Sequence, residues 1–231
     1  MSIKEYFLDF VDLIYPDSCV ACRNPLVSGE EILCVYCEEE LAITDYHKDD
    51  YNPIKALFYG RCQIKQGASF LHFSKGGRTQ EILHALKYKN MPEVGVKLGS
   101  LMADLYKQTA FFKSIDILIP VPLHPKKLKK RGYNQSTAIA EGIQKSLDLP
   151  IMENALIRVI ANSTQTKKSR FARWKNVESI FKVPNPSTLQ NKHILLIDDV
   201  ITTGATLEAS VLQLLTIPGV TVSVVSLAYA E

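Results

Sequence analysis

Two adjacent carboxylates and a threonine-rich turn are the residues of this sequence best suited to chemistry. Asp198 and Asp199 directly follow the four apolar residues 194–197, and the turn Thr202-Thr-Gly-Ala-Thr206 comes shortly after them. A short apolar run is typical of a buried strand, and the apolar spacing of residues 207–215 predicts a helix. The pattern therefore predicts a strand, a polar loop and a helix, the arrangement at which parallel α/β sheets bind phosphorylated ligands.

The turn has the parts that a phosphate site needs. Thr202, Thr203 and Thr206 offer hydroxyl groups, Gly204 permits a positive φ, and the amides from Ala205 onward point out of a helix N-terminus. The turn contains no lysine, which argues against a G-x4-G-K-[ST] loop, and no G-x-G-x-x-G occurs in the chain. An ordinary buried strand followed by a polar turn is the alternative interpretation.

The two carboxylates have a different role from the turn. Asp198 and Asp199 would repel a phosphate, so we expect them to accept hydrogen bonds from sugar hydroxyls or to bind a divalent metal. A phosphate at one end and a diol at the other describe a ribose 5-phosphate.

Four cysteines form two close pairs near the N-terminus. Cys19 and Cys22 are separated by two residues, as are Cys34 and Cys37, and eleven residues lie between the pairs. This spacing predicts a structural Zn²⁺ site, because four thiolates fill a tetrahedral shell and leave no open position for catalysis. Two disulfides and a redox C-x-x-C are the alternatives; the first is disfavoured because the sequence shows no secretion signal.

Composition limits the class of protein. The chain has 231 residues, 46 % hydrophobic and 22 % charged, which is typical of a globular protein with a sizeable core. No apolar run approaches the length of a membrane span, and the first residues lack a basic region followed by an apolar core. We therefore expect a cytoplasmic protein without a membrane span.

Charge is distributed unevenly along the chain. Residues 1–60 hold 12 acidic and 4 basic side chains, a balance of −8, whereas residues 61–231 hold 12 and 23, a balance of +11. The larger part is therefore suited to a polyanion, either a sugar phosphate or a nucleic acid.

A polar segment, residues 45–52, predicts the boundary between two parts. Residues 1–50 would hold a short amphipathic helix and the four-cysteine module, and residues 51–231 the main α/β domain. The expected strands are residues 56–59, 68–73, 115–122, 155–160, 194–197 and 220–227, and the expected helices are residues 3–14, 79–88, 98–106, 136–147 and 207–215. His47 is expected at the surface, and Cys62 as a partly buried residue outside the metal site.

Two basic segments follow expected strands. In residues 123–135, Arg131 could bind a phosphate in bidentate fashion and Tyr133 could stack on a base, although a solvated helix start explains the same composition. Residues 162–177 are polar, basic and aromatic, as in a mobile lid that closes over an anion.

Taken together, the segments resemble the ComF/GntX family of phosphoribosyltransferase-like proteins over nearly the whole chain. The resemblance rests on the four-cysteine module and on the segments Ile82-Leu-His-Ala-Leu-Lys-Tyr88, Pro120-Val-Pro-Leu-His-Pro125, Arg131-Gly-Tyr-Asn-Gln135, Thr164-Gln165, Arg173-Trp-Lys-Asn-Val177 and 194–206. The last resembles the phosphoribosyl pyrophosphate (PRPP) motif. The resemblance implies a type I phosphoribosyltransferase fold, a parallel Rossmann-like sheet flanked by helices, after a small N-terminal zinc ribbon. Many members carry further cysteines where this chain keeps only Cys62, so one zinc site is expected.

The resemblance also implies a role for each site residue. Thr202, Thr203, Gly204, Ala205 and Thr206 would bind the 5-phosphate of PRPP. Asp198 and Asp199 would accept from the ribose hydroxyls, directly or through Mg²⁺. Leu123 and His124 would line the pyrophosphate side with Arg131 at its edge, and Arg173 would come from the lid.

Two functions are compatible with this resemblance. Members of the family are linked to DNA uptake in natural competence, which implies PRPP binding together with single-stranded DNA and a helicase-like partner, with Tyr133, Phe171 and Trp174 as candidate DNA contacts. The alternative is a PRPP-dependent phosphoribosyltransferase of nucleotide salvage with an unknown acceptor and no role in DNA handling. The fold alone does not separate them.

Overall fold

The computed structural model describes residues 17–159 and 180–230. The helix expected at residues 3–14 and the lid expected at residues 162–177, with Phe171, Arg173 and Trp174, lie outside the described residues.

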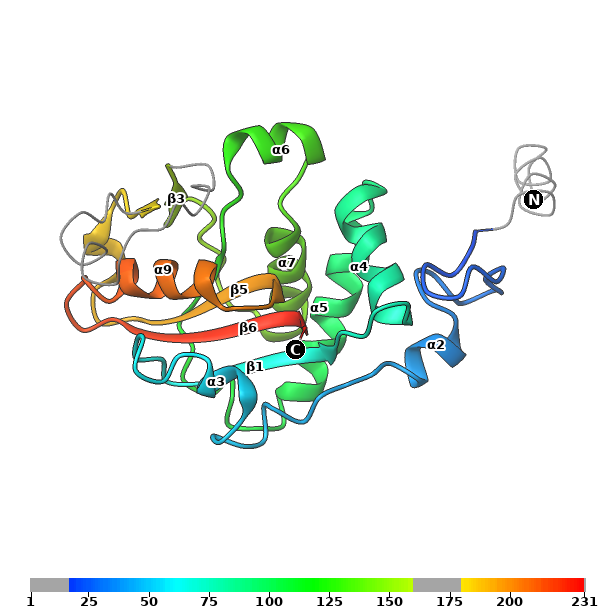
Figure 1. Ribbon diagram of the computed structural model, residues 1–231, viewed down its shortest axis with the longest axis horizontal. Helices are drawn as coiled ribbons and strands as arrows, with labels where there is room; N and C mark the ends of the chain where they lie inside the picture. The colour runs from blue at the N-terminus through cyan, green and yellow to red at the C-terminus, as the bar shows by residue number, and fades with distance from the viewer. Residues whose placement is uncertain (1–16, 160–179, 231) are drawn as a thin grey trace.

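A four-stranded parallel sheet forms the centre of the molecule (Figure 1). Its order is β1 (Gly67–His72), β6 (Thr221–Tyr229), β5 (His193–Ile201) and β2 (Ile117–Pro120), and every neighbouring pair is parallel. All four strands come from apolar segments that the sequence pattern indicated, because strands covered on both faces need nearly continuous apolar runs. The α/β fold class expected from the sequence, a parallel sheet flanked by helices, is confirmed.

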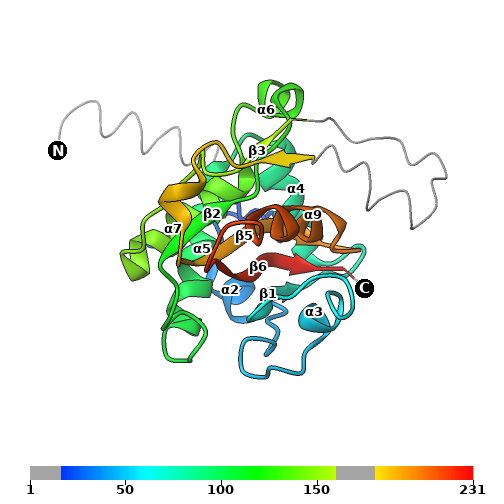
Figure 2. The same ribbon diagram turned by 90° about the vertical axis from the view of Figure 1, so that its left-hand side faces the viewer.

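Successive residues of the central strand pack into two different cores. Leu195 and Ile197 belong to the core shared with α4 (Arg78–Tyr88), α5 (Pro92–Tyr106) and α7 (Gln135–Leu147). Ile194 and Leu196 belong to the core shared with α3 (Pro53–Ala56), η1 (Pro186–Leu189) and α9 (Ala205–Leu214). Figure 2 shows α5 and α7 on one side of the sheet and α3 and α9 on the other. The alternation follows from the two-residue period of a strand.

Helices α5 and α7 approach each other closely. A Cβ atom added at Gly99 would lie 2.2 Å from the Ile139 carbonyl oxygen, and one added at Gly142 would lie 2.1 Å from the Val96 carbonyl oxygen. Any larger residue would force the helices apart. This close packing fixes where the N-terminus of α7 meets the sheet.

Single bridges extend the sheet at both edges. Ile43 pairs with Leu71 of β1, and Ile151 pairs with Leu118 of β2. Because Ile151 takes the place beside β2, residues 155–159 do not join the central sheet, and the strand expected at residues 155–160 is confirmed only in part. Only β3 (Ile157–Arg158) forms there, antiparallel to β4 (Phe181–Lys182); residue 160 lies outside the described residues.

The strand expected at residues 56–59 is also wrong. Asn52 accepts a hydrogen bond from the Lys55 amide at 3.0 Å, and Pro53 occupies the first helical position. An N-cap followed by proline favours a helix start, and the chain forms the short helix α3 and then turns.

His47 is buried, so its expected surface position is wrong. Its side chain is stacked on Tyr106 at the end of α5, with ring centroids 3.9 Å apart. The segment 45–52 therefore lies across the end of α5 and covers it.

The four-cysteine segment contains the short helix α2 (Val35–Glu39) and packs against the same core as α4 and α5. The segment 42–44 that follows it pairs with β1, through the Thr44 amide to the Phe70 carbonyl at 2.8 Å. The division at residue 50 stays a prediction.

Helix α6 (Pro125–Arg131) projects from the body and buries none of its residues (Figure 1). Within residues 17–159 and 180–230, no helix is long and apolar enough to cross a membrane.

Candidate functional site

Strand β5 carries both aspartates near its carboxyl end, on the central part of the sheet. Asp198 Oδ1 accepts hydrogen bonds from the Asp199 amide at 2.8 Å and from Ser136 Oγ at 3.4 Å. Burial raises the pKa of Asp198 to about 7, with the neighbouring charge of Asp199 as a further cause. The charge of Asp199 therefore disfavours ionisation of Asp198, and the pair of carboxylates needs compensating positive charge.

Lys87, on α4, supplies positive charge to this pair. Its Nζ lies 3.1 Å from Asp199 Oδ2, and both side chains are about one-fifth exposed, at 21 % and 17 %. In the sequence, Lys87 stands out only as part of the segment Ile82–Tyr88, and nothing there indicates that it meets Asp199.

The threonine-rich turn leads directly from β5 into α9. Gly204 has φ +71°, in the left-handed region that favours glycine, and stands at the N-cap of the helix. Gly204 has no side chain to cap α9, and the Ala205 amide donates to Thr203 Oγ1 at 3.5 Å. The first amides of a helix have no intrahelical partner, so those of α9 remain available to a ligand. Together with the hydroxyls of Thr202 and Thr203, which are exposed, they form a group of donors suited to an anion.

Arg61 contacts both the turn and the start of α9 through hydrogen bonds. Its Nη1 donates to the Thr203 carbonyl at 2.9 Å and to the Leu57 carbonyl at 3.0 Å, and its Nε donates to Glu208 at 3.0 Å. Glu208 lies in the first turn of α9, where its charge would oppose a bound anion; the ion pair with Arg61 offsets that charge. The sequence gave no signal for this role.

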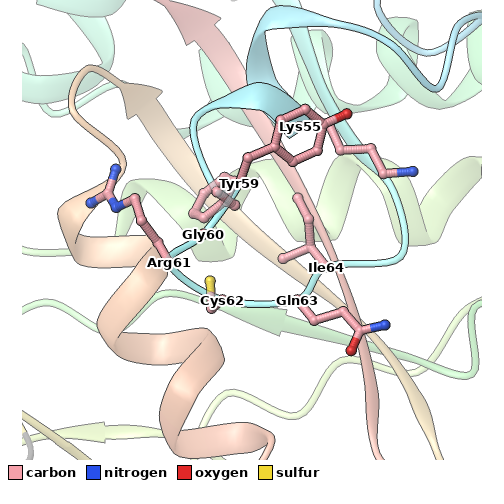
Figure 3. Close-up of a pocket in the computed structure, with 8 residues that line it drawn as sticks. Lys55, Tyr59, Gly60, Arg61, Cys62, Gln63 and Ile64 are labelled. Atoms are coloured by element: carbon pink, nitrogen blue, oxygen red, sulfur yellow. The ribbon is translucent and has the colours of Figure 1, made fainter. Parts of the chain in front are cut away.

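Arg61 also lines an open pocket of about 430 Å³ formed by Lys55 and residues 58–64. Figure 3 shows Arg61 and Lys55 on opposite sides of this pocket, with Cys62 below Gly60. Cys62 is half-buried, as expected, and burial raises the pKa of its thiol to about 11. The pocket therefore adjoins the turn without including the two aspartates.

The loop after β2 lies beside β5. The Val121 amide donates to the Ile197 carbonyl at 2.8 Å, so the chain passes next to Asp198 as it leaves the sheet. Asn134, the N-cap of α7, donates to the Val121 carbonyl at 3.0 Å and fixes this loop. Leu123 and His124 follow, both half-buried, and His124 caps α6 by accepting from the Lys126 amide at 3.2 Å.

The end of α4 is held by the segment after α6. Tyr133 Oη donates to the Leu86 carbonyl, and the Arg131 guanidinium lies 5.7 Å from the centre of the Tyr88 ring. Arg131 also donates to Gln135 Oε1 at 2.6 Å. The segments 82–88 and 131–135 thus contact each other at the residues just before and just after Lys87.

The four cysteines meet at a second site. The sulfur atoms of Cys19, Cys22, Cys34 and Cys37 all lie within 4.8 Å of one another, and all five cysteines of the chain are free. Cys22 Sγ and Cys34 Sγ are 3.8 Å apart. Sulfur atoms bound to one tetrahedral zinc ion at about 2.3 Å lie roughly 3.8 Å apart, so this arrangement fits a structural metal ion.

The structure therefore brings together most residues singled out in the sequence. The aspartates, the turn Thr202–Thr206 and the loop with Leu123 lie around the carboxyl end of β5, whereas Arg131 contacts Tyr88 and Gln135. Lys87, Arg61 and Ser136 were missed, because each reaches the site from a distant part of the chain.

An open parallel sheet flanked by helices, with a polar turn at the carboxyl end of a central strand, places the chain in the class of open α/β proteins. Competence protein F of Haemophilus influenzae is 30 % identical over 199 residues, covering 82 % of this chain and 86 % of that protein. Competence protein ComFC of Bacillus subtilis is 28 % identical, covering 84 % and 77 %, and DNA utilization protein YhgH of Escherichia coli K12 is 28 % identical, covering 88 % and 92 %. The chain belongs to the ComF family of competence proteins.

No model of a protein family matches the chain. Among solved structures, adenine phosphoribosyltransferase from Leishmania tarentolae aligns with a TM-score of 0.39 and 13 % identity, covering 82 % of this chain and 94 % of that one. The allosteric regulatory enzyme of purine biosynthesis aligns with a TM-score of 0.42 and 19 % identity, covering 61 % of this chain and 29 % of that one.

Proposed function

We propose that this chain is a PRPP-binding protein of the ComF type that acts in DNA uptake or handling during natural competence. The observation that carries the proposal is the placement of Asp198 and Asp199 one short turn before the N-terminus of α9. Carboxylates that can accept hydrogen bonds from hydroxyl groups lie at one end of the turn, and donors that can bind a phosphate lie at the other end. This arrangement matches the ribose and the 5-phosphate of a single ligand. Membership of the ComF family supports the link to DNA.

In this proposal each group of residues contacts one part of PRPP. The amides and hydroxyls of Thr202–Thr206 bind the 5-phosphate, and Asp198 and Asp199 accept from the ribose hydroxyls. Leu123 and His124 line the pyrophosphate side, with Arg131 at its edge. Arg173 belongs to the proposed lid, outside the described residues. In a transferase reaction, the acceptor would form a bond to the anomeric carbon as the bond to pyrophosphate breaks, helped by positioning and by charge stabilisation.

Two metal ions have separate roles in the proposal. Carboxylate oxygens are the ligands that Mg²⁺ prefers, so the aspartates fit a Mg²⁺ ion that accompanies PRPP and neutralises part of its pyrophosphate charge. The four-cysteine cluster fits one Zn²⁺ with a structural role. Thiolate ligands also fit the reducing cytoplasm in which we place the protein.

Helix α6 supports the DNA part of the proposal. Lys126, Lys127, Lys129 and Lys130 are all exposed on a projecting element. Lysines on such a surface bind phosphates of single-stranded DNA in a salt-dependent way. A helicase-like partner remains part of the same proposal.

Calorimetry with PRPP and Mg²⁺ tests the ligand. The parent should bind, and Asp199→Asn should lower the affinity by about tenfold or more, since it replaces a charged hydrogen-bond acceptor. Asp148→Asn is the matched control, because Asp148 is exposed and asparagine tolerates its positive φ of 52°. Equal affinity in parent and Asp199→Asn would show that the aspartates are not the binding site.

Release of pyrophosphate from PRPP, measured against a panel of acceptors with and without single-stranded DNA, separates the two functions. Turnover with a nucleobase and no DNA would favour the salvage enzyme. Bound PRPP without turnover, in a protein that also binds DNA, would favour a binding role.

A further inference from the structure

Lys87 lies beside the Asp198–Asp199 pair, and none of the ligand contacts proposed above involves it. Its Nζ is 3.1 Å from Asp199 Oδ2, and no described residue other than Lys87 forms an ion pair within 4.0 Å of this carboxylate. Hydroxyl groups of a ribose, or a divalent cation, would need the same carboxylate oxygens. The ammonium group and the ligand therefore compete for Asp199.

The position of the Lys87 backbone does not depend on this ion pair. On one side of it the Leu86 carbonyl accepts from Tyr133, and on the other side the Tyr88 ring lies under the Arg131 guanidinium. The helix end is thus fixed by its neighbours, while the long lysine stem can change rotamer. The ammonium can leave Asp199 without a movement of α4.

The chemistry of the ligand determines where this ammonium would go. In PRPP the pyrophosphate is attached to the carbon next to the one that bears the 2-hydroxyl group. A ribose whose hydroxyls contact Asp199 therefore presents its pyrophosphate within a few ångströms of that carboxylate. A cation released at this point lies beside the most negative part of the ligand, where a charge-assisted hydrogen bond forms.

We propose that Lys87 is a ligand-contacting residue that neutralises Asp199 in the free protein and contacts the pyrophosphate group once the ribose is bound. This inference rests on the proposed PRPP function and assigns a cation to the pyrophosphate side, where Leu123 and His124 offer none with a fixed charge. It explains why the segment around Lys87 and the segment around Tyr133 contact each other: together they position the cation.

The test compares two ligands that differ only in the pyrophosphate. Calorimetry is done with PRPP and with ribose 5-phosphate, at constant Mg²⁺, on the full chain and on Lys87→Met, Lys87→Arg and Lys89→Met. Lys87→Met should bind PRPP about tenfold or more weaker, because a charge-assisted hydrogen bond is lost, and should bind ribose 5-phosphate at least as well as the parent. Lys87→Arg should recover most of the PRPP affinity.

Lys89→Met is the matched control. Lys89 is exposed and lies two residues after Lys87, and its substitution removes the same charge. It should bind both ligands like the parent. Thermal unfolding of each variant shows whether the fold is kept.

Each other outcome overturns the inference in a recognisable way. Equal losses for both ligands in Lys87→Met would show a structural role only, and unchanged PRPP affinity would show that Lys87 does not contact the pyrophosphate; in both cases the proposed function stands. If the parent binds neither ligand, the proposed function itself fails, and the inference fails with it.

Discussion

The four-cysteine segment and the aspartate site are built in different ways. The first takes all four sulfur atoms from 19 consecutive residues, Cys19–Cys37, and they meet within 4.8 Å. The second takes its contacts from Arg61, Lys87, Ser136 and Asp198–Thr206, which are brought together by the sheet and its helices. A site with local ligands can be recognised from spacing, whereas a site with distant partners shows only its central motif.

Helix α4 connects the two regions. At its N-terminal end Arg78 pairs with Glu40, and Glu81 pairs with Arg23 at 2.7 Å, both partners belonging to the four-cysteine segment and the residues just after α2. At its other end it presents Lys87 to Asp199. The two regions therefore share one helix. Substitutions in each region, followed by measurement of stability and of ligand affinity, show whether a change in one region affects the other.

Removal of the metal should have the largest effect. With a strong chelator, or in Cys37→Ser, the four-cysteine segment should lose its structure and the thermal midpoint should fall by many degrees, since a structural Zn²⁺ contributes on the order of 10 kcal/mol in small modules. Elemental analysis should give one zinc per chain before treatment. Cys62→Ser, at a half-buried cysteine outside the cluster, is the control and should keep both the metal and most of the stability. An unchanged midpoint after chelation would show that the cluster holds no structural ion.

Loss of Arg61 should have an intermediate effect that is seen mainly in ligand binding. In Arg61→Ala the Thr203 carbonyl loses a donor and Glu208 loses its counter-charge. Affinity for ribose 5-phosphate should fall by about fivefold to thirtyfold, as expected for one or two hydrogen bonds of about 1 kcal/mol each, and calorimetry measures it. Arg61→Lys should recover the charge without the bidentate geometry and should lie between the two. Equal affinity in the parent, Arg61→Ala and Arg61→Lys would show that Arg61 does not contribute to ligand binding at the turn.

The exposed pair between the two regions should have the smallest effect. The Arg23 side chain is 72 % exposed, so Arg23→Ala should leave both the thermal midpoint and the PRPP affinity unchanged within error. Calorimetry and thermal unfolding measure the two quantities. A clear fall in PRPP affinity at constant stability would instead show that the four-cysteine segment influences the aspartate site through α4.

Much of the fold followed from periodicity, and the failures have physical causes. The strands around residues 68–73, 115–122, 194–197 and 220–227 were found because apolar runs covered on both faces leave a clear pattern. Residues 56–59, expected as a strand, instead form the end of α3 and the turn after it, because the cap and proline before them outweigh the apolar pattern. His47 is buried because a distant aromatic ring, Tyr106, lies under it.

The sequence by itself determined the donors and acceptors of the main site, because Asp198, Asp199 and Thr202–Thr206 are neighbours along one strand and turn. It also determined the four-cysteine cluster, because all four thiols lie close together along the chain. The tertiary structure decided which positively charged side chains contact the residues of the main site. Lys87 meets Asp199 only because α4 and β5 contribute to the same core, and Arg61 meets Thr203 only because the segment after α3 lies next to the start of α9. Electrostatic partners depend on distance in space, and a sequence records only distance along the chain.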